Sequence, residues 1–440
     1  MQIAKLDSYE RAPISAATLT LLCDFAAGDV RRPLHHLDPD WEEVFQAVCR
    51  NGLLGLTHRY LKHRQACEYP PPEFRQAVSA AYRTSAIRMA LMYLRIGQVL
   101  ARLAESGIDF MVVKGPALAH TVYPDPDVRA FNDLDLVVRE RDWTSMHRLL
   151  VAMGFRPDQD LPQPPPKLVP QEILYEQKYW HRKTGLLVEV HYDDILNAGL
   201  ASRDVEGFWQ RAICVDVDGT PVQALSLEDQ LIHLCAHAHY HGYTRLNWFS
   251  DIAFIVRDHA TALDWGQLLE TVQTEEAQIG VYYSLQFLDQ LLDVSAPDGV
   301  LAALRPDRFR RWFHERYLPQ EKVLSLRPMW RPDFSFYFAP FLKRLLPDLL
   351  VMGRRAEKLH YLLRLLAPPR DWLAYYYSLN GATIIWAHYV LHPLKLACHL
   401  VEEILTAAIQ SIDSRDSVAE MRRDVYDGTV QSYVRRNSEQ

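Results

Sequence analysis

Apolar residues recur at helical spacing over residues 73–106 and then stop at Gly107. Hydrophobic positions three or four residues apart lie on one face of a helix, so this run predicts a long amphipathic helix. Glycine readily adopts the left-handed conformation that closes a helix, which makes Gly107 the expected end. The repeating positions are Ile87, Leu91, Leu94, Val99 and Leu103.

Short apolar runs replace the helical pattern after Gly107. Residues 109–113 and 134–138 are short, mainly apolar runs, as in buried strands. Residues 142–153 return to helical spacing and stop at Gly154. A strand, a connection, a second strand and a helix are the beginning of an α/β layer.

Two dipeptides, Thr184-Gly185 and Asp218-Gly219, have the composition of hairpin turns. Ser226 follows the second hairpin and precedes two acidic residues and an apolar helical pattern, as a helix N-cap does. The expected antiparallel pairs are residues 177–183 with 186–192 and residues 213–217 with 221–225.

These patterns divide the chain into a helical region over residues 1–106, a core over residues 107–225 and a second helical region over residues 226–440. The expected fold class is α/β or α+β, with a small mixed sheet flanked by largely helical N- and C-terminal regions. A proline-rich segment, residues 161–170, predicts an irregular loop inside the core.

Composition and charge narrow the class of protein. The formal net charge of -7 argues against a broad nucleic-acid-binding surface. Six scattered cysteines without a CxxC pair indicate reduced, mostly buried thiols of a cytoplasmic protein. The most apolar late stretch, residues 382–391, is shorter than the roughly 20 residues of a membrane span, so no span is expected; an interfacial helix there stays open.

Three carboxylates suggest a metal site. Asp133 and Asp135 are two residues apart on a predicted strand and therefore point to the same face. Glu189 lies on the later strand that contains residues 186–192. If the two strands are neighbours, the three acids complete a site for two metal ions roughly 3.5–4 Å apart. The alternative for the aspartate pair alone is a solvated strand face.

Basic residues precede the aspartates. Lys114-Gly115 ends the first strand, where the lysine supplies positive charge and the glycine permits close approach of an anion. Arg129 can contact a triphosphate through its planar guanidinium. The structural alternatives are a solvated strand end for Lys114 and an ion pair with Asp125 or Asp127 for Arg129.

Taken in order, these residues resemble the uncharacterised nucleotidyltransferase family, which belongs to the DNA polymerase β-like superfamily of minimal nucleotidyltransferases. The resemblance covers about residues 107–256. The turn is a departure, since superfamily members usually have Gly-Ser where this chain has Lys114-Gly115-Pro116. The matching positions are Lys114-Gly115, Tyr123-Pro124, Arg129, Asp133, Asp135, Gly154-Phe155, Glu189, His191, His237 and residues 246–251.

The resemblance implies transfer of a nucleoside monophosphate, or of a phosphate unit, from a nucleoside triphosphate such as ATP to a hydroxyl acceptor. The acceptor is a small molecule, a peptide or a protein. Mg²⁺ or Mn²⁺ would be held by Asp133, Asp135 and Glu189, with Glu189 as a base if the aspartates alone hold the metal. Phosphate contacts fall to Lys114, Gly115 and Arg129, and supporting positions around the site to His191, His237 and Asp251.

A second constellation lies on the helix that follows Ser226. His233, His237 and His241 recur every four residues and so share one helix face, at the spacing that zinc sites use. Packing, or lining the acceptor side of the cleft, is the favoured reading. Asp251 is expected to pair with one of these histidines or to reach the cleft.

Two further functions stay open. A catalytically inactive nucleotide-binding regulatory module would keep the same fold, but the intact set of three carboxylates favours an enzyme. An RNA-modifying nucleotidyltransferase of toxin type is disfavoured by the acidic net charge.

Overall fold

The computed structural model describes residues 14–28, 37–63, 69–158, 177–192, 195–196, 203–317, 320, 323, 355–377, 379, 385–398 and 401. The chain forms two compact units, residues 1–327 and residues 328–440. The expected boundaries after residues 106 and 225 fall inside the first unit, and whether they separate independently folding parts stays a prediction. The proline-rich segment lies outside the described residues.

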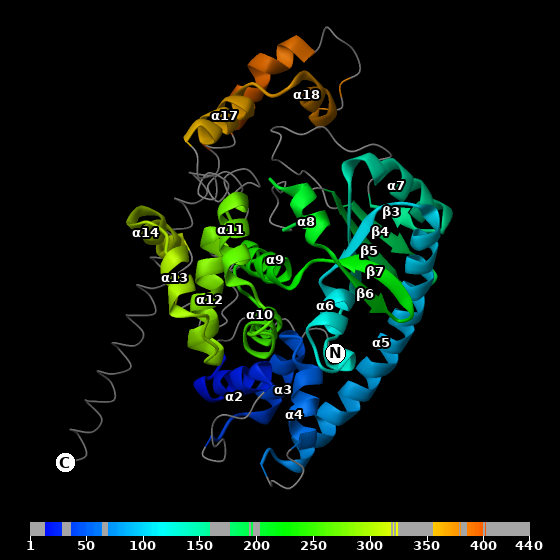
Figure 1. The fold of residues 1–440 in the computed structure, drawn as a ribbon, viewed down its shortest axis with the longest axis vertical. Helices are drawn as coiled ribbons and strands as arrows, with labels where there is room; N and C mark the ends of the chain where they lie inside the picture. The colour runs from blue at the N-terminus through cyan, green and yellow to red at the C-terminus, as the bar shows by residue number, and fades with distance from the viewer. Residues whose placement is uncertain are drawn as a thin grey trace, which may run out of the picture. The chain divides into compact units, whose positions relative to one another are not determined.

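A mixed sheet is the centre of the first unit (Figure 1). The described strands follow the order β3-β4-β5-β2-β1-β7-β6. β2 pairs in parallel with β5 and β1 in parallel with β7, and the remaining neighbours are antiparallel. This sheet and its helical flanks confirm the expected fold class. The strands are β1 (Phe110–Val113), β2 (Asp133–Val138), β3 (Arg156–Pro157), β4 (Gln177–His181), β5 (Leu186–Tyr192), β6 (Ile213–Val217) and β7 (Thr220–Ala224).

Both expected hairpins are confirmed. β4 pairs with β5, although the turn spans residues 182–185 and not Thr184-Gly185 alone, and β6 pairs with β7 around Asp218-Gly219. Asp218 has a φ of 50° and Gly219 a φ of 83°. Two consecutive positive φ angles are what a two-residue turn of type I′ needs, and Asp-Gly is among the pairs that adopt them most readily.

One face of the sheet is covered by α5 (Pro72–Ser106) and α7 (Trp143–Ala152). α5 ends at Gly107, whose φ is 72°, as expected. The side chains that fill this layer come from alternate positions of the central strands and from both helices. They include Ile96, Val99, Leu100, Leu103, Trp143, Met146, Leu134, Leu136, Val188 and Val190.

The buried face of α5 differs from the expected one. Ile87, Leu91 and Leu94 are exposed by 66%, 47% and 62%. A second stripe at helical spacing runs through Met89, Met92, Ile96, Val99 and Leu103, and this stripe is the one that packs inward. The helix carries two apolar stripes that share Val99 and Leu103, so periodicity predicted the helix correctly and three of the five expected apolar positions wrongly.

α9 (Leu227–Tyr240) begins at Ser226, whose Oγ accepts a hydrogen bond from the Asp229 amide at 3.2 Å, as an N-cap does. α9 packs against α10 (Leu246–Asp258), α11 (Trp265–Glu275) and α12 (Gln278–Leu292). His233 and Leu234 of α9 also lie against the end of β1. α9 therefore joins the sheet to the helices that follow it.

The remaining elements are short helices. In the first unit they are α2 (Ala16–Ala27), α3 (Trp41–Arg50), α4 (Leu54–His63), α6 (Gly115–Thr121), η1 (Pro126–Val128), η2 (Glu140–Asp142), α8 (Val205–Arg211), α13 (Asp298–Leu304) and α14 (Arg308–Tyr317). In the second unit they are α17 (Arg355–Leu366), α18 (Arg370–Tyr376) and a helix over residues 385–398.

No helix among the described residues combines the length and the apolar character that crossing a bilayer needs. The five described cysteines are thiols rather than disulfides. Cys49, Cys214 and Cys398 are exposed, so the expectation of mostly buried thiols is wrong.

The layer between α5 and the sheet generates the first prediction. Ile96→Ala should lower the free energy of unfolding by about 2–5 kcal/mol, because Ile96 is fully buried and its removal leaves a cavity. Leu94→Ala, on the exposed face of the same helix, should change it by less than about 0.5 kcal/mol. Urea denaturation measures both, and equal losses would contradict this assignment of faces.

The packing of α9 generates the second prediction. Burial lowers the pKa of His239 to about 4, and its ring stacks on that of His314 with centroids 5.2 Å apart. The unfolded chain protonates this imidazole near pH 6.5, so it binds more protons than the native state between pH 6.5 and 4. The stabilising contribution is complete above pH 6.5 and is lost as the pH falls towards 4.

His239→Phe keeps an aromatic ring but removes the titration. Its free energy of unfolding should therefore fall less steeply below pH 6.5, by roughly 1 kcal/mol for each pH unit. Urea denaturation at several pH values measures the slopes. Tyr240→Phe, at the exposed next residue, is the control and should keep the wild-type slope. Parallel profiles for His239→Phe and wild type would show that His239 does not carry this dependence.

Candidate functional site

The register between β2 and β5 places two of the three candidate carboxylates opposite each other. Asp135 is the direct partner of Glu189 across this parallel pair. One carboxylate oxygen of each residue and one ring nitrogen of His191 all lie within 4.8 Å of one another. Among the described residues this is the only cluster of acidic, histidine or cysteine side chains that close. It lies on the face of the sheet opposite α5 and α7, because side chains alternate along a strand.

Asp133 lies on the same face but outside this group of three. It pairs with Leu187, two residues before Glu189, and is only partly buried. Burial and the neighbouring charge of Asp135 raise the pKa of Asp133, against the opposing charges of Lys114 and Arg129. The structure therefore groups His191, rather than Asp133, with Asp135 and Glu189. A metal-ligand role for Asp133 stays a prediction.

Lys114 supplies a positive charge at the centre of the site. It stands between β1 and α6, and its Nζ lies 3.2 Å from Oδ1 of Asp135. Its φ is 52°, a backbone conformation that costs a residue with a Cβ free energy. The neighbouring residue, Val113, pairs with Asp135 across β1 and β2, so this turn holds the ammonium over the carboxylate.

The pKa of Asp135 is held below its ordinary value. Asp135 is 3% exposed, and burial alone would raise its pKa. The charge of Lys114 and the neighbouring imidazole of His191, whose Nε2 lies 3.6 Å from Oδ1, outweigh burial. Asp135 is thus an anion whose charge is already compensated by neighbouring groups.

Lys178 on β4 is a site residue that the sequence analysis missed. It pairs with Glu189 across β4 and β5, and its Nζ lies 3.3 Å from Oε1 of Glu189. The signal was present in the predicted hairpin. Once His181 is set opposite Leu186, counting back along β4 and forward along β5 brings Lys178 opposite Glu189.

This donor set fits a divalent cation. Two carboxylate oxygens and an imidazole nitrogen are ligands that divalent metals use in proteins. Three carboxylates face two ammonium groups, which leaves an excess of one negative charge for an added cation to balance. Asp135, Glu189 and His191 are the residues that would hold it.

Arg129 forms a fork with Asp251 instead of pointing freely into the site. Its Nε and Nη2 donate to the two carboxylate oxygens of Asp251 at 2.7 and 2.9 Å, and Nη1 donates to the Ala130 carbonyl at 2.6 Å. Tyr123 donates to the same carboxylate at 2.6 Å. The carboxylate of Asp251 is therefore taken by Arg129 and Tyr123, and the expected pairing with a histidine is wrong. A phosphate contact by Arg129 stays a prediction.

Two histidines of α9 face the site. Burial, helped by the charge of Lys114, lowers the pKa of His233 to about 3 and moves that of His237 well below its ordinary value. The two rings are nearly parallel with centroids 6.3 Å apart. The nitrogens of His233, His237 and His241 do not form a close set, so the structure supports packing at the site rather than a zinc site of these three.

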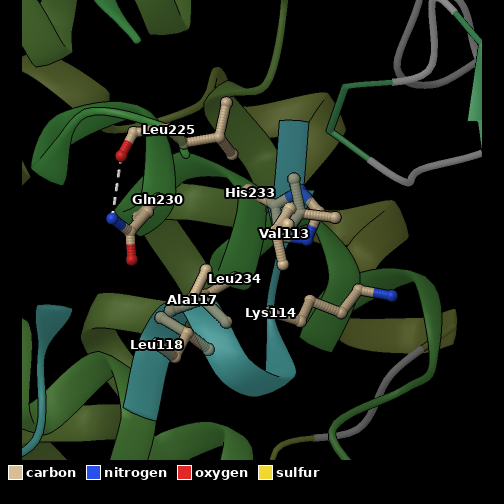
Figure 2. A pocket seen from close by; sticks show the side chains of 9 residues that line it. Val113, Lys114, Ala117, Leu118, Leu225, Gln230, His233 and Leu234 are labelled. Carbon is tan, nitrogen blue, oxygen red and sulfur yellow. Dashed lines mark hydrogen bonds between the residues drawn. The ribbon is translucent and has the colours of Figure 1, made fainter. Parts of the chain in front are cut away.

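Lys114 and His233 line a small cavity (Figure 2). Val113, Ala117 and Leu234 also line it. Its volume of about 10 Å³ holds roughly one water molecule and no nucleotide. The cavity therefore belongs to the packing between β1 and α9, not to a substrate pocket.

The sequence profile of the family described as uncharacterised nucleotidyltransferase matches residues 38–293, more than half of the chain. The chain belongs to this family. The match extends beyond residues 107–256 on both sides, so it includes helices from α3 to α12 that the resemblance had left unmatched. The family expected from Lys114-Gly115 and the two aspartates is thereby confirmed.

Comparisons beyond the uncharacterised nucleotidyltransferase family add little. The crystal structure of an antigenic nucleotidyltransferase-like protein from Paracoccidioides brasiliensis is 17% identical, with 48% of this chain and 95% of that chain covered and a TM-score of 0.31. At so low a TM-score the likeness carries no argument about this chain. No curated protein sequence matches this chain significantly.

The fork between Arg129 and Asp251 generates the third prediction. Asp251→Asn should lower the free energy of unfolding by about 3–5 kcal/mol, because it leaves the guanidinium buried without its counter-charge. Asp258→Asn removes one carboxylate of an exposed pair with Arg257 and should cost less than about 1 kcal/mol. Chemical denaturation at pH 7 compares the two, and a loss below 1 kcal/mol for Asp251→Asn would refute the structural role of the fork.

Proposed function

We propose that this nucleotidyltransferase-family protein is an enzyme that moves a nucleoside monophosphate, or a phosphate unit, from a nucleoside triphosphate such as ATP to a hydroxyl acceptor, with the help of a divalent metal. The acceptor is a small molecule, a peptide or a protein. A cytoplasmic location is part of the proposal, since the described cysteines are thiols.

One observation carries the proposal. Asp135 and Glu189 come from strands that are far apart in the sequence and face each other directly across β2 and β5. Burying like charges side by side is unfavourable unless cations neutralise them. The paired carboxylates lie within the residues that match the nucleotidyltransferase family. This supports the proposal that they bind a metal cation.

The positions of Lys114 and Lys178 support the proposed use of a triphosphate. Lys114 and Lys178 each hold a carboxylate that a metal would bind. With those oxygens bound to a metal, both ammonium groups would be free to contact phosphate oxygens. The metal, when bound, supplies positive charge that stabilises the attacking and leaving oxygens.

The transfer itself needs little covalent chemistry from the protein. The acceptor oxygen forms a bond to the α-phosphorus, the bond between that phosphorus and the α–β bridging oxygen breaks, and pyrophosphate leaves. The proton of the acceptor hydroxyl goes to a carboxylate. Asp133 suits this task, because it lies beside the group of three and its pKa is raised.

A second function is favoured by one feature of the same site. Because Lys114 and Lys178 already neutralise Asp135 and Glu189, the site is stable without a metal. This is the arrangement that a nucleotide-binding regulatory module without catalysis would keep. The two functions differ in whether a group from the nucleoside triphosphate is transferred to an acceptor.

The fourth prediction separates them. The purified full chain is incubated with Mg²⁺ or Mn²⁺, a labelled nucleoside triphosphate and a lysate fraction that contains candidate acceptors. The wild type should transfer label, and Asp135→Asn should lower the rate by more than roughly 100-fold, since it removes a charged metal ligand. Asp109→Asn, at an exposed carboxylate before β1, is the control and should keep the wild-type rate.

Circular dichroism checks that Asp135→Asn is folded, and Glu189→Gln is the second variant if it is not. Nucleotide binding without transfer in every acceptor fraction would contradict the enzyme and support the regulatory module. Equal rates for Asp135→Asn and wild type would remove the site from the reaction.

A further inference from the structure

Trp180 of β4 lies on the same face of the sheet as the carboxylates of the site. Lys178, two residues earlier on β4, pairs with Glu189, and side chains two residues apart on a strand point to the same side. Trp180 itself pairs with Leu187 of β5, which in turn pairs with Asp133 of β2. These three residues therefore form one row across neighbouring strands, directly beside the row with Lys178 and Glu189.

The indole ring of Trp180 is open to solvent. Trp180 is 48% exposed, whereas Tyr179, which points to the opposite face, is 1% exposed and packs in the layer formed with α5 and α7. A large apolar ring left in water forgoes the stabilisation that burial supplies. A planar ring that stays exposed beside paired carboxylates is a surface on which a flat ligand can stack.

A positive charge stands at the outer end of the row. Arg156 of β3 pairs with Trp180 and is exposed, and β3 is the edge strand of the described sheet. Neighbouring strands are about 4.8 Å apart, so the backbones at Trp180 and Asp133, two strands apart, are separated by about 10 Å. This spacing suits one small molecule that contacts the guanidinium, covers the indole and reaches the carboxylate.

The two sides of the carboxylates differ in what they offer a substrate. Lys114 and the turn at Gly115, which the proposed function assigns to the triphosphate, follow β1 on one side, and β3 and β4 lie on the other. His233 of α9 packs on the β1 side, where it lines the small cavity with Lys114. In an in-line displacement the attacking and leaving oxygens lie on opposite sides of the phosphorus. With the triphosphate at Lys114, the acceptor therefore approaches from the side of β3 and β4.

We propose that Trp180 and Arg156 form the acceptor subsite, and that the acceptor is a small molecule with a planar aromatic ring, an anionic group and a hydroxyl. The ring stacks on the indole of Trp180, and the phosphate or carboxylate pairs with the guanidinium of Arg156. The hydroxyl points to Asp133, which takes its proton. The inference rests on the proposed function for the reaction, and it adds the chemical class of the acceptor.

The fifth prediction concerns the binding of acceptor probes to the purified full chain. Isothermal titration calorimetry should show binding of adenosine 5′-monophosphate or of N-acetyltyrosine, which each carry a ring, an anion and a hydroxyl. The tighter of the two tells whether phosphate or carboxylate is the preferred anion. Ribose 5-phosphate and N-acetylserine lack the ring and should bind at least roughly tenfold more weakly. No binding of either aromatic probe, or equal affinity for the probes without a ring, would overturn the proposal.

Variants assign the subsite. Trp180→Ala should raise the dissociation constant of the bound probe by roughly 5–100-fold because stacking is lost, whereas Trp180→Phe should keep it within about threefold. Arg156→Gln should weaken binding of the anionic probe and leave that of uncharged adenosine unchanged. Trp312→Ala and Arg102→Gln, at exposed residues of α14 and α5, are the matched controls and should change neither.

The same variants separate this subsite from the triphosphate site, which also accepts nucleotides under the proposed function. An unchanged dissociation constant in Trp180→Ala would place the probe elsewhere and overturn the inference. Binding is measured without transfer, so binding that depends on Trp180 without any label transfer would contradict the proposed function alone. Transfer to an acceptor without a ring, at the same rate in Trp180→Ala and wild type, would contradict this inference alone.

Discussion

The parallel pairing of β2 with β5 determines which side chains meet at the site. Glu189 and His191 alternate along β5 with Val188 and Val190, which are buried against the layer formed by α5. A shift of one residue would turn the acid and the histidine into that apolar layer and expose the valines. The hydrophobic packing on one face therefore sets the polar arrangement on the other.

Local patterns predicted the elements well because their causes are local. The Asp218-Gly219 turn, the Ser226 cap and the Gly107 helix end each depend on the conformational preferences of a few neighbouring residues. The choice between two apolar stripes of α5 depends on which stripe the sheet contacts. That contact is not encoded within the helix, and three of the five expected buried positions were accordingly wrong.

Long-range contacts at the site could be predicted only in part. The spacing of Asp133 and Asp135 shows that they share a face, and neighbouring strands had to be assumed to add Glu189. Whether Asp133 or His191 comes closest to the other two depends on strand register and side-chain length. Lys178 was within reach of sequence reasoning, since hairpin register alone locates it.

Arg129 illustrates the remaining gap. Its partner is Asp251, which lies 122 residues later in the chain, and the nearer acids Asp125 and Asp127 were the natural candidates. The fork joins the segment before β2 to α10. It thereby connects the sheet to the helices that follow it within the matched residues 38–293. A buried guanidinium is used here to connect two parts of one fold.

The pairing of Lys114 and Lys178 with the acids of the site has a consequence for how the newly made chain folds in the cell. Many small metalloproteins stay unfolded until their ion arrives. Here the chain carries its own counter-ions, so, if it binds a metal as proposed, a newly made molecule can fold before the ion is bound. Supply of the ion would then govern how much of the population works, and not how much of it survives proteolysis.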